Sequence, residues 1–311
     1  SYPGKEAGRS LMHPVKNLMI SALQRLPASL VKPVAMRYIA GETLEDAVRV
    51  VRDLNARKRM ATTDVLGENV FTEEESLRAV QACQRVLAAI RKERLNANLS
   101  IKLTNFGLNI DESFCYGNVK RILQLARDDE NFVRIDMEDS SMTGLTLNLY
   151  ERLRAEGFEN VGVVIQAYLR RSEEDVKRLI RNRANVRIVK GIYIEPEDIA
   201  FQDREEIRRN YLKLLQKLLE AKNYFGIATH DDFLVQGAYQ YIREMNLPPA
   251  AYEFQMLYGV RPRLQDRIVA EGHRMRIYVP FGKQWHSYSI RRFKENPRIA
   301  RYVLQALISR K

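Results

Sequence analysis

The sequence predicts an α/β fold, a (β/α)8 barrel of the TIM type preceded by an N-terminal helical arm. From about Thr72 onward, short β-branched runs alternate with amphipathic helical stretches, an order typical of βα units around a parallel sheet. Eight such pairs fit into roughly 240 residues, a usual size for this barrel. Before residue 58, helical patterns follow one another with no strand between them.

The eight expected strands are short runs rich in apolar and β-branched residues, and each precedes a helix-like stretch. They are Met60–Leu66, Leu99–Leu103, Phe132–Asp136, Val161–Ala167, Val186–Val189, Phe225–Thr229, Tyr252–Met256 and Met275–Val279.

Local signals mark several of the helices. Thr72 and Glu75 form a capping box at the start of a stretch with helical apolar spacing. Ser172 begins another helix and is followed by three carboxylates, which the helix dipole favours in the first turn. Gly272 is a good C-terminal cap for the helix over residues 261–271.

The chain divides into an arm, residues 1–58, and a catalytic barrel, residues 59–311, which ends in a substrate-binding helix. Leu18–Leu26, Leu30–Ile39 and Leu44–Asn55 have helical patterns. Because no long Gly/Pro-rich linker follows them, we expect the arm to pack on the barrel.

Composition limits the function classes. The 311 residues include 51 Lys and Arg against 39 Asp and Glu, a formal charge of +12, which attracts any polyanion. Cys83 and Cys115 are too few for a disulfide framework or a cysteine-built zinc site, so a reducing compartment is expected. No window approaches the ~18 apolar residues of a membrane span, and no secretory signal is evident.

Polar residues at the ends of the apolar runs indicate the active site, because catalytic residues of this barrel lie at the C-terminal ends of strands. One alone would be an ordinary solvated strand end, but six strands share the feature. They carry Lys102; Asp136, Glu138 and Asp139; Gln166; Arg187 and Lys190; Thr229, His230 and Asp231; and Tyr278. Cations alternating with carboxylates and amides suit an extended anionic ligand.

A second constellation lies in the last helical segment. Arg291 and Arg292 are adjacent, and Glu295 lies within helical reach of both. Paired guanidiniums grip a carboxylate through parallel hydrogen bonds. An exposed basic helix face is the alternative interpretation.

Two other kinds of site are not expected. Neither GxGxxG nor GxxxxGK[ST] occurs, which argues against a Rossmann or P-loop nucleotide site. His230 and His273 lack the spacing of paired metal ligands, so no metal site is expected.

At these positions the chain resembles the monofunctional bacterial proline dehydrogenases, from the segment 64–68 to the C-terminus. The matching motifs are Ser100-Ile101-Lys102-Leu103-Thr104, Arg134-Ile135-Asp136-Met137-Glu138-Asp139-Ser140, Arg187-Ile188-Val189-Lys190-Gly191, Ala228-Thr229-His230-Asp231, Glu253-Phe254-Gln255-Met256-Leu257-Tyr258-Gly259, Tyr278-Val279-Pro280-Phe281-Gly282 and Arg291-Arg292-Phe293-Lys294-Glu295.

The resemblance implies a distorted (β/α)8 barrel that binds FAD, oxidises L-proline to Δ1-pyrroline-5-carboxylate and passes electrons to membrane quinone. It gives Asp136 and Arg187 catalytic roles, with Arg187 near flavin N5. Substrate would contact Lys102, Tyr193, Leu257, Tyr278, Arg291 and Arg292. FAD would contact Met137, Gln166, Arg187, Lys190, Gly191, Ile192, Thr229, His230 and Glu295.

Two further expectations concern the site entrance and the membrane. The resemblance implies that Glu68 and Arg291 form an ion pair over bound substrate, a reversible gate. The quinone acceptor and the charge of +12 together imply a cytoplasmic protein in peripheral contact with the anionic inner face of the membrane.

Two rival functions fit parts of the sequence. A barrel lyase or aldolase could use Lys102 or Lys190 to form a Schiff base, but it would not call for the arginine pair. A basic nucleic-acid-binding protein would carry exposed aromatics among its cations, whereas the aromatics here fall mainly within apolar runs. No nucleic-acid partner is therefore expected.

The arginine pair yields the first testable prediction. Replacing Arg291 or Arg292 with Met removes a charge-assisted hydrogen bond of ~1.5 to 3 kcal/mol. We expect KM for proline to rise more than tenfold while FAD stays bound, as steady-state kinetics will measure. An unchanged KM in both variants contradicts the assignment.

Overall fold

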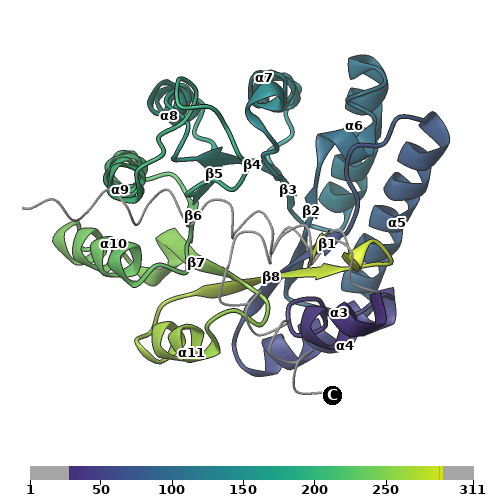
Figure 1. Ribbon diagram of the computed structural model, residues 1–311, viewed down its shortest axis with the longest axis horizontal. Coiled ribbons are helices and arrows are strands. Elements are labelled where there is room, and N and C mark those ends of the chain that lie inside the picture. The colour runs from purple at the N-terminus through teal and green to yellow at the C-terminus, as the bar shows by residue number, and fades with distance from the viewer. Residues whose placement is uncertain (1–27, 287, 290–311) are drawn as a thin grey trace, which may run out of the picture.

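The protein is described by a computed structural model that covers residues 28–286 and 288–289 (Figure 1). Eight parallel strands close into a barrel in chain order, which confirms the expected (β/α)8 fold. The strands are β1 (Met60–Val65), β2 (Ala97–Ile101), β3 (Val133–Ile135), β4 (Val161–Gln166), β5 (Asn185–Val189), β6 (Phe225–Ala228), β7 (Tyr252–Leu257) and β8 (Met275–Phe281).

Helices surround the barrel on its outer side (Figure 1). They are α3 (Ala28–Ala35), α4 (Leu44–Ala56), α5 (Glu73–Lys92), α6 (Glu112–Asp128), α7 (Ser140–Ala155), α8 (Ser172–Arg181), α9 (Arg204–Glu220), α10 (Asp232–Glu244) and α11 (Pro262–Ala270), with short 3-10 turns η1 (Leu103–Phe106) and η2 (Pro249–Ala251). The N-cap of α5 is Thr72, whose side chain accepts from the Glu75 N–H, as expected.

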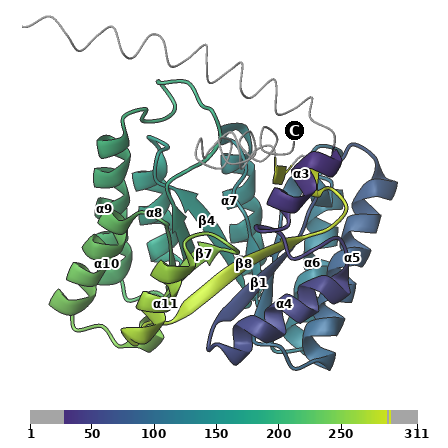
Figure 2. The same cartoon turned by 60° about the horizontal axis from the view of Figure 1, so that its bottom comes forward.

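A helix of the arm lies beside β8 and β1. Helix α4 packs on both strands (Figure 2), and Val51 and Leu54 on its apolar face join the barrel core. The expected packing of the arm is thus confirmed for α4. The predicted helix Leu18–Leu26 lies outside the described residues, and the domain boundary at residue 58 stays a prediction.

The predicted bounds of β2 were wrong by two residues at each end. The strand starts at Ala97, and Leu103 already belongs to η1, for which Lys102 is the N-cap residue. Asn is unfavourable in strands, but Asn98 accepts a hydrogen bond from the Thr62 hydroxyl of β1 at 2.5 Å. This contact across the sheet outweighs the local propensity.

Polar side chains fill the barrel interior. Asp136 follows β3 and bonds Arg187 of β5, which also bonds Gln255 of β7. Because these strands are not neighbours in the sheet, their side chains can meet only inside the barrel. The alternate residues, such as Leu99 and Ile135, pack outward in the hydrophobic core.

Two strand glycines make room for this interior. A side chain on Gly162 of β4 would place its Cβ 2.4 Å from Arg134 Nη1 and 2.6 Å from the carbonyl oxygen of Asn185. On Gly226 of β6 it would lie 2.4 Å from Gln255 Nε2. Both strands therefore need glycine where long polar side chains cross.

Among the residues that the structure describes, no helix has both the length and the apolar character needed to cross a bilayer.

The close approach at Gly162 is testable. Gly162→Ala should lower the free energy of unfolding by about 1 to 3 kcal/mol, because the methyl group overlaps buried neighbours. Gly117 in α6 is the matched control, since an added Cβ meets nothing within 4 Å. Gly117→Ala should raise stability by about 0.4 to 1 kcal/mol. Equilibrium urea unfolding compares the two, and equal stability of the variants contradicts the packing argument.

Candidate functional site

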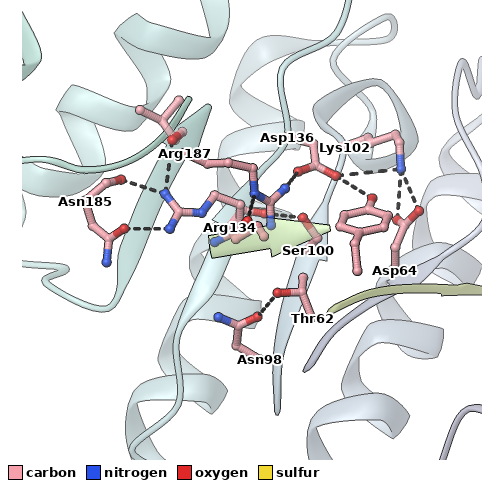
Figure 3. Close-up of polar contacts among 12 residues, drawn as sticks. Thr62, Asp64, Asn98, Ser100, Lys102, Arg134, Asp136, Asn185 and Arg187 are labelled. Atoms are coloured by element: carbon pink, nitrogen blue, oxygen red, sulfur yellow. Dashed lines mark hydrogen bonds and ion pairs between the residues drawn. The ribbon is translucent and has the colours of Figure 1, made fainter. Parts of the chain in front are cut away.

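A buried ion cluster occupies the C-terminal end of the barrel (Figure 3). Lys102, directly after β2, bonds both carboxylate oxygens of Asp64 in β1, at 2.8 and 3.0 Å from its Nζ. Its Nζ lies 4.0 Å from Oδ2 of Asp136. One ammonium is therefore shared between two carboxylates.

Asp136 is also held from the opposite side. Arg187 Nη1 donates to Asp136 Oδ1 at 2.6 Å, and the Tyr278 hydroxyl donates to Oδ2 at 2.6 Å. The Arg187 guanidinium lies over the Tyr278 ring, 5.3 Å from its centroid. These contacts fix four predicted site residues relative to one another.

The electrostatics of the cluster separate the two aspartates. Burial raises the pKa of Asp64, and Lys102 only partly offsets that effect. Burial acts in the same direction on Asp136, but Arg187 and Lys102 outweigh it and lower its pKa. Asp136 therefore carries the more stable negative charge.

Lys102 stays protonated in this setting. Burial disfavours its charge, but Asp64 and Asp136 outweigh burial and raise the pKa of Lys102. Burial and the nearby carboxylates also raise the pKa of Tyr278, so its hydroxyl remains a donor. An ammonium held in this way binds anions well and is a poor nucleophile.

Gln166, at the end of β4, carries an oriented amide. Its Nε2 donates to the carbonyl oxygen of Glu138 at 2.8 Å. Its Oε1 is buried and has no hydrogen-bond partner within residues 28–286 and 288–289. Because buried acceptors are nearly always satisfied, this oxygen marks a place where a ligand donor would fit.

Glu138 itself faces the turn after β2. Its carboxylate accepts from the Thr104 main-chain N–H at 3.0 Å and from the Thr104 hydroxyl. Burial nevertheless raises the pKa of Glu138. The side chain therefore ties η1 to the end of β3, while its main chain orients Gln166.

A second group of cations surrounds Asp231, after β6. Arg208 of α9 donates from Nε and Nη2 at 2.9 and 2.7 Å, while Lys190 lies at 3.3 Å and Arg204 at 3.8 Å. Burial opposes the charge of Asp231, but Arg208 and Lys190 lower its pKa to about 2. Three cations around one carboxylate form a basic rim.

His230 and Thr229, which precede Asp231 in the chain, both form hydrogen bonds with main-chain groups. Leu257 donates its main-chain N–H to His230 Nε2 at 2.9 Å, which commits that ring nitrogen to β7. Thr229 Oγ1 accepts from the main-chain N–H of Asp231 at 3.1 Å. Met137 is buried in the hydrophobic core.

The segment after β5 is tethered beside the site. Gly191 has φ +116, and a Cβ there would overlap the Tyr168 ring, so glycine is required. Glu195 accepts from the Ser140 N–H and hydroxyl at 2.7 Å each. Between them, Tyr193 is partly buried and Ile192 is exposed.

The remaining predicted residues fall elsewhere or outside the description. Glu68 follows β1 and is partly buried, whereas Arg291, Arg292 and Glu295 lie outside the described residues, so the clamp and the gate stay predictions. Within the described ranges, no three His, Cys, Asp or Glu side chains are grouped to hold a metal ion.

Sequence reasoning gave no role to Asp64, Glu253 or Gln255. All three lie inside runs that were interpreted as apolar strands, and all are buried. A charged or amide residue inside such a run was the signal that could have identified them, because burial of that kind requires a partner.

The Lys102–Asp64 pair provides a stability test. Lys102→Met should lower the free energy of unfolding by ~3 to 5 kcal/mol at neutral pH, because Asp64 is left buried without its cation. Burial raises the pKa of Asp64 and Lys102 partly offsets that effect. Loss of the ammonium raises this pKa further, so the deficit should grow as pH rises from 5 to 8.

The double variant Lys102→Met, Asp64→Asn is the control, because it removes the unpaired charge. It should recover most of the stability and lose the pH dependence, as thermal unfolding at each pH will measure. A deficit that is the same at pH 5 and pH 8, or no recovery in the double variant, contradicts this account.

Comparison with known proteins identifies the family of this chain. The family model described as "Proline dehydrogenase" matches residues 47–304. "Proline dehydrogenase 1" of Bacillus subtilis is 40% identical over 89% of this chain and 91% of its own. "Proline dehydrogenase" of Deinococcus radiodurans is 35% identical over 88% of this chain and 90% of its own.

A solved structure has a similar fold. The crystal structure of proline utilization A (PutA) from Bdellovibrio bacteriovorus, inactivated by N-propargylglycine, superposes with a TM-score of 0.80 at 28% identity. The match covers 86% of this chain, which spans about a third (33%) of that longer protein. On its matched residues, its identity to full-length relatives and its closed eight-stranded barrel, this chain belongs to the proline dehydrogenase family.

Proposed function

We propose that this chain oxidises L-proline to Δ1-pyrroline-5-carboxylate with FAD as its cofactor. The observation that carries the proposal is the buried cluster in which Asp136 joins Lys102, Arg187 and Tyr278 at the C-terminal end of the barrel. In a chain of this family, these groups supply the charges that the reaction needs.

The residues present fit FAD. The buried, unpartnered Oε1 of Gln166 would accept from a ring N–H, the kind of donor that a flavin carries. The basic rim of Lys190, Arg204 and Arg208 suits the two phosphates of the cofactor. Gly191 would let the chain pass close beside it. FAD, when bound, supplies the hydride acceptor.

The protein groups serve three tasks. Lys102 provides a permanent cation for the proline carboxylate, together with Arg291 and Arg292. Asp136 stabilises the positive charge that develops on the ring nitrogen as hydride leaves the neighbouring carbon. Arg187 would supply a fixed cation to FAD, which favours the negative charge that the cofactor gains on reduction. The amine must be neutral, so that its lone pair can drive the step, and no covalent intermediate with the protein is needed.

The apolar ring of the substrate would contact Tyr193, Leu257 and Tyr278. The edge of the Tyr278 ring is available for this role because its hydroxyl is held by Asp136. Aromatic and aliphatic surface suits a small saturated ring. Glu68 and Arg291 would form an ion pair over the bound substrate. If they form this gate, a Glu68→Ala variant should show slower flavin reduction by proline.

A Schiff-base mechanism is disfavoured by the same contacts. Lys102 is kept protonated between two carboxylates. Lys190 is partly exposed and pairs with Asp231 at 3.3 Å. Neither amine is in the desolvated, carboxylate-free setting that activates a lysine.

The decisive experiment is spectroscopic. The purified protein should show the visible absorption of a bound flavin, and anaerobic addition of L-proline should bleach it. Asp136→Asn should slow the bleaching at least tenfold, because the variant lacks the negative charge. A protein that cannot be reconstituted with FAD, or whose flavin is not reduced by proline, refutes the function.

We also propose that electrons pass to a membrane quinone, from a cytoplasmic protein bound peripherally to the inner leaflet. The formal charge of +12 supports attraction to anionic lipid. Phe71 and Ile194, on segments that leave the C-terminal ends of β1 and β5, are 71% and 101% exposed, and exposed apolar side chains at one end of the barrel support contact with a bilayer.

Vesicle sedimentation tests this association. The protein should pellet with anionic vesicles at low salt, remain in solution with neutral vesicles, and be released at high salt because the attraction is screened. Failure to pellet with anionic vesicles at any salt concentration contradicts peripheral binding.

A further inference from the structure

Arg187 is held by two acceptors on opposite parts of its guanidinium. Nη1 donates to Asp136 Oδ1 at 2.6 Å, as described above, and Nε donates to Gln255 Oε1 at 2.5 Å. Arg187 is 6% exposed. Two acceptors fix the plane of a guanidinium, whereas one would leave it free to rotate about that bond.

The orientation of the Gln255 amide is set by Glu253, two residues earlier on β7. Gln255 Nε2 donates to Glu253 Oε1 at 2.6 Å. A carboxylate can only accept, so the amide nitrogen must face Glu253 and the amide oxygen must face Arg187. The reverse orientation would place two oxygens together and two donors together.

Glu253 is in turn anchored at the other end of the barrel interior. Arg276 of β8 donates to both of its oxygens, at 2.6 Å from Nε and 3.1 Å from Nη2, and the Tyr224 hydroxyl donates at 2.6 Å. Arg276 is itself bonded to the main chain of β1, at the carbonyl oxygen of Ala61. These contacts outweigh burial and lower the pKa of Glu253, so the carboxylate stays charged.

Gly226 of β6 leaves space for the Gln255 amide. A Cβ at this position would lie 2.4 Å from Nε2. Gln255 is 5% exposed and Glu253 is 2% exposed, so neither amide nor carboxylate has bulk water as an alternative partner. The contact geometry is thus enforced by packing as well as by charge.

We propose that Gln255 and Glu253 form a positioning relay that holds Arg187 in its working orientation beside the hydride acceptor. The inference rests on the proposed function. Gln255 contacts Arg187 at Nε and would act only through Arg187, so it is a positioning residue. The relay anchors the guanidinium to β7 and β8, which makes its orientation independent of whether substrate is bound near Asp136.

The test uses the purified holoenzyme and three variants. Gln255→Leu removes both hydrogen bonds of the amide at similar volume. Gln255→Glu keeps an acceptor for Arg187, and when protonated it also keeps a donor for Glu253. Gln265→Leu is the matched control, because Gln265 is also a 5% exposed glutamine, but it bonds the main chain of Leu257 and Val260.

In Gln255→Leu, a misoriented cation should stabilise the reduced flavin less. We expect the equilibrium constant for flavin reduction to fall at least tenfold, which is about 30 mV for a two-electron couple. The limiting rate of flavin reduction by proline should also fall at least tenfold, while the half-saturating proline concentration changes less than threefold. Gln265→Leu should keep the parent values for all three.

In Gln255→Glu, the deficit relative to the parent should depend on pH. At low pH the new carboxyl is protonated and copies the amide, so the flavin potential should be close to that of the parent. As pH rises it ionises and faces Glu253, so the potential should fall progressively below the parent value. A deficit that does not change with pH would overturn the proposal, and this variant decides the question if Gln255→Leu fails to fold or to bind FAD.

A measurement that does not depend on turnover separates the relay from the proposed function. The Arg187 Nε–H signal in 15N-labelled protein, assigned by its loss in Arg187→Lys, should exchange with solvent at least tenfold faster in Gln255→Leu than in the parent or in Gln265→Leu. If proline does not reduce the parent flavin, the function fails, yet this exchange still decides the relay. Equal exchange in parent and Gln255→Leu, or parent-like potential and rate in that variant, refutes it.

Discussion

The carboxylate of Asp136 is the point on which the polar interior of the barrel depends. It accepts hydrogen bonds from Arg187 and Tyr278 and lies within 4.0 Å of Lys102. These partners come from β5, β8 and the end of β2, so one side chain joins three separate parts of the sheet. Without that charge, two buried cations would face each other across the barrel, a costly arrangement in a medium of low polarity.

Charge alternation explains why such an interior is stable. Asp64, Lys102, Asp136 and Arg187 succeed one another with opposite signs, so each buried ion has a counter-ion on at least one side. Buried ion pairs of this kind contribute little net stability compared with apolar packing. Their value lies in fixed geometry, because a side chain bonded on two sides cannot adopt another rotamer without leaving a buried group unpaired.

The sequence was sufficient for the barrel and for much of its site. Polar residues that close several apolar runs indicate the C-terminal end of a parallel barrel, which is why Lys102, Asp136 and Gln166 could be placed there before the fold was known. Asp64 and Gln255 lie within strands, where a polar residue signals a buried partner but does not identify it, because Lys102 and Arg187 are distant from them in sequence. The same limit applies to α4: its apolar spacing predicts a helix, but only the barrel shows which strands that helix covers.

The seam between the two ends of the chain has a consequence for synthesis. Ala40 donates its N–H to the carbonyl oxygen of Pro280, Gly41 accepts from the N–H of Gly282, and Glu42 accepts from the Trp285 indole at 2.9 Å. Helix α4, which follows, packs on β8 as well as β1. Helix α4 is synthesised early, but its apolar face is fully covered only after β8 has left the ribosome. During that interval the nascent chain presents an apolar surface of the kind that chaperones bind.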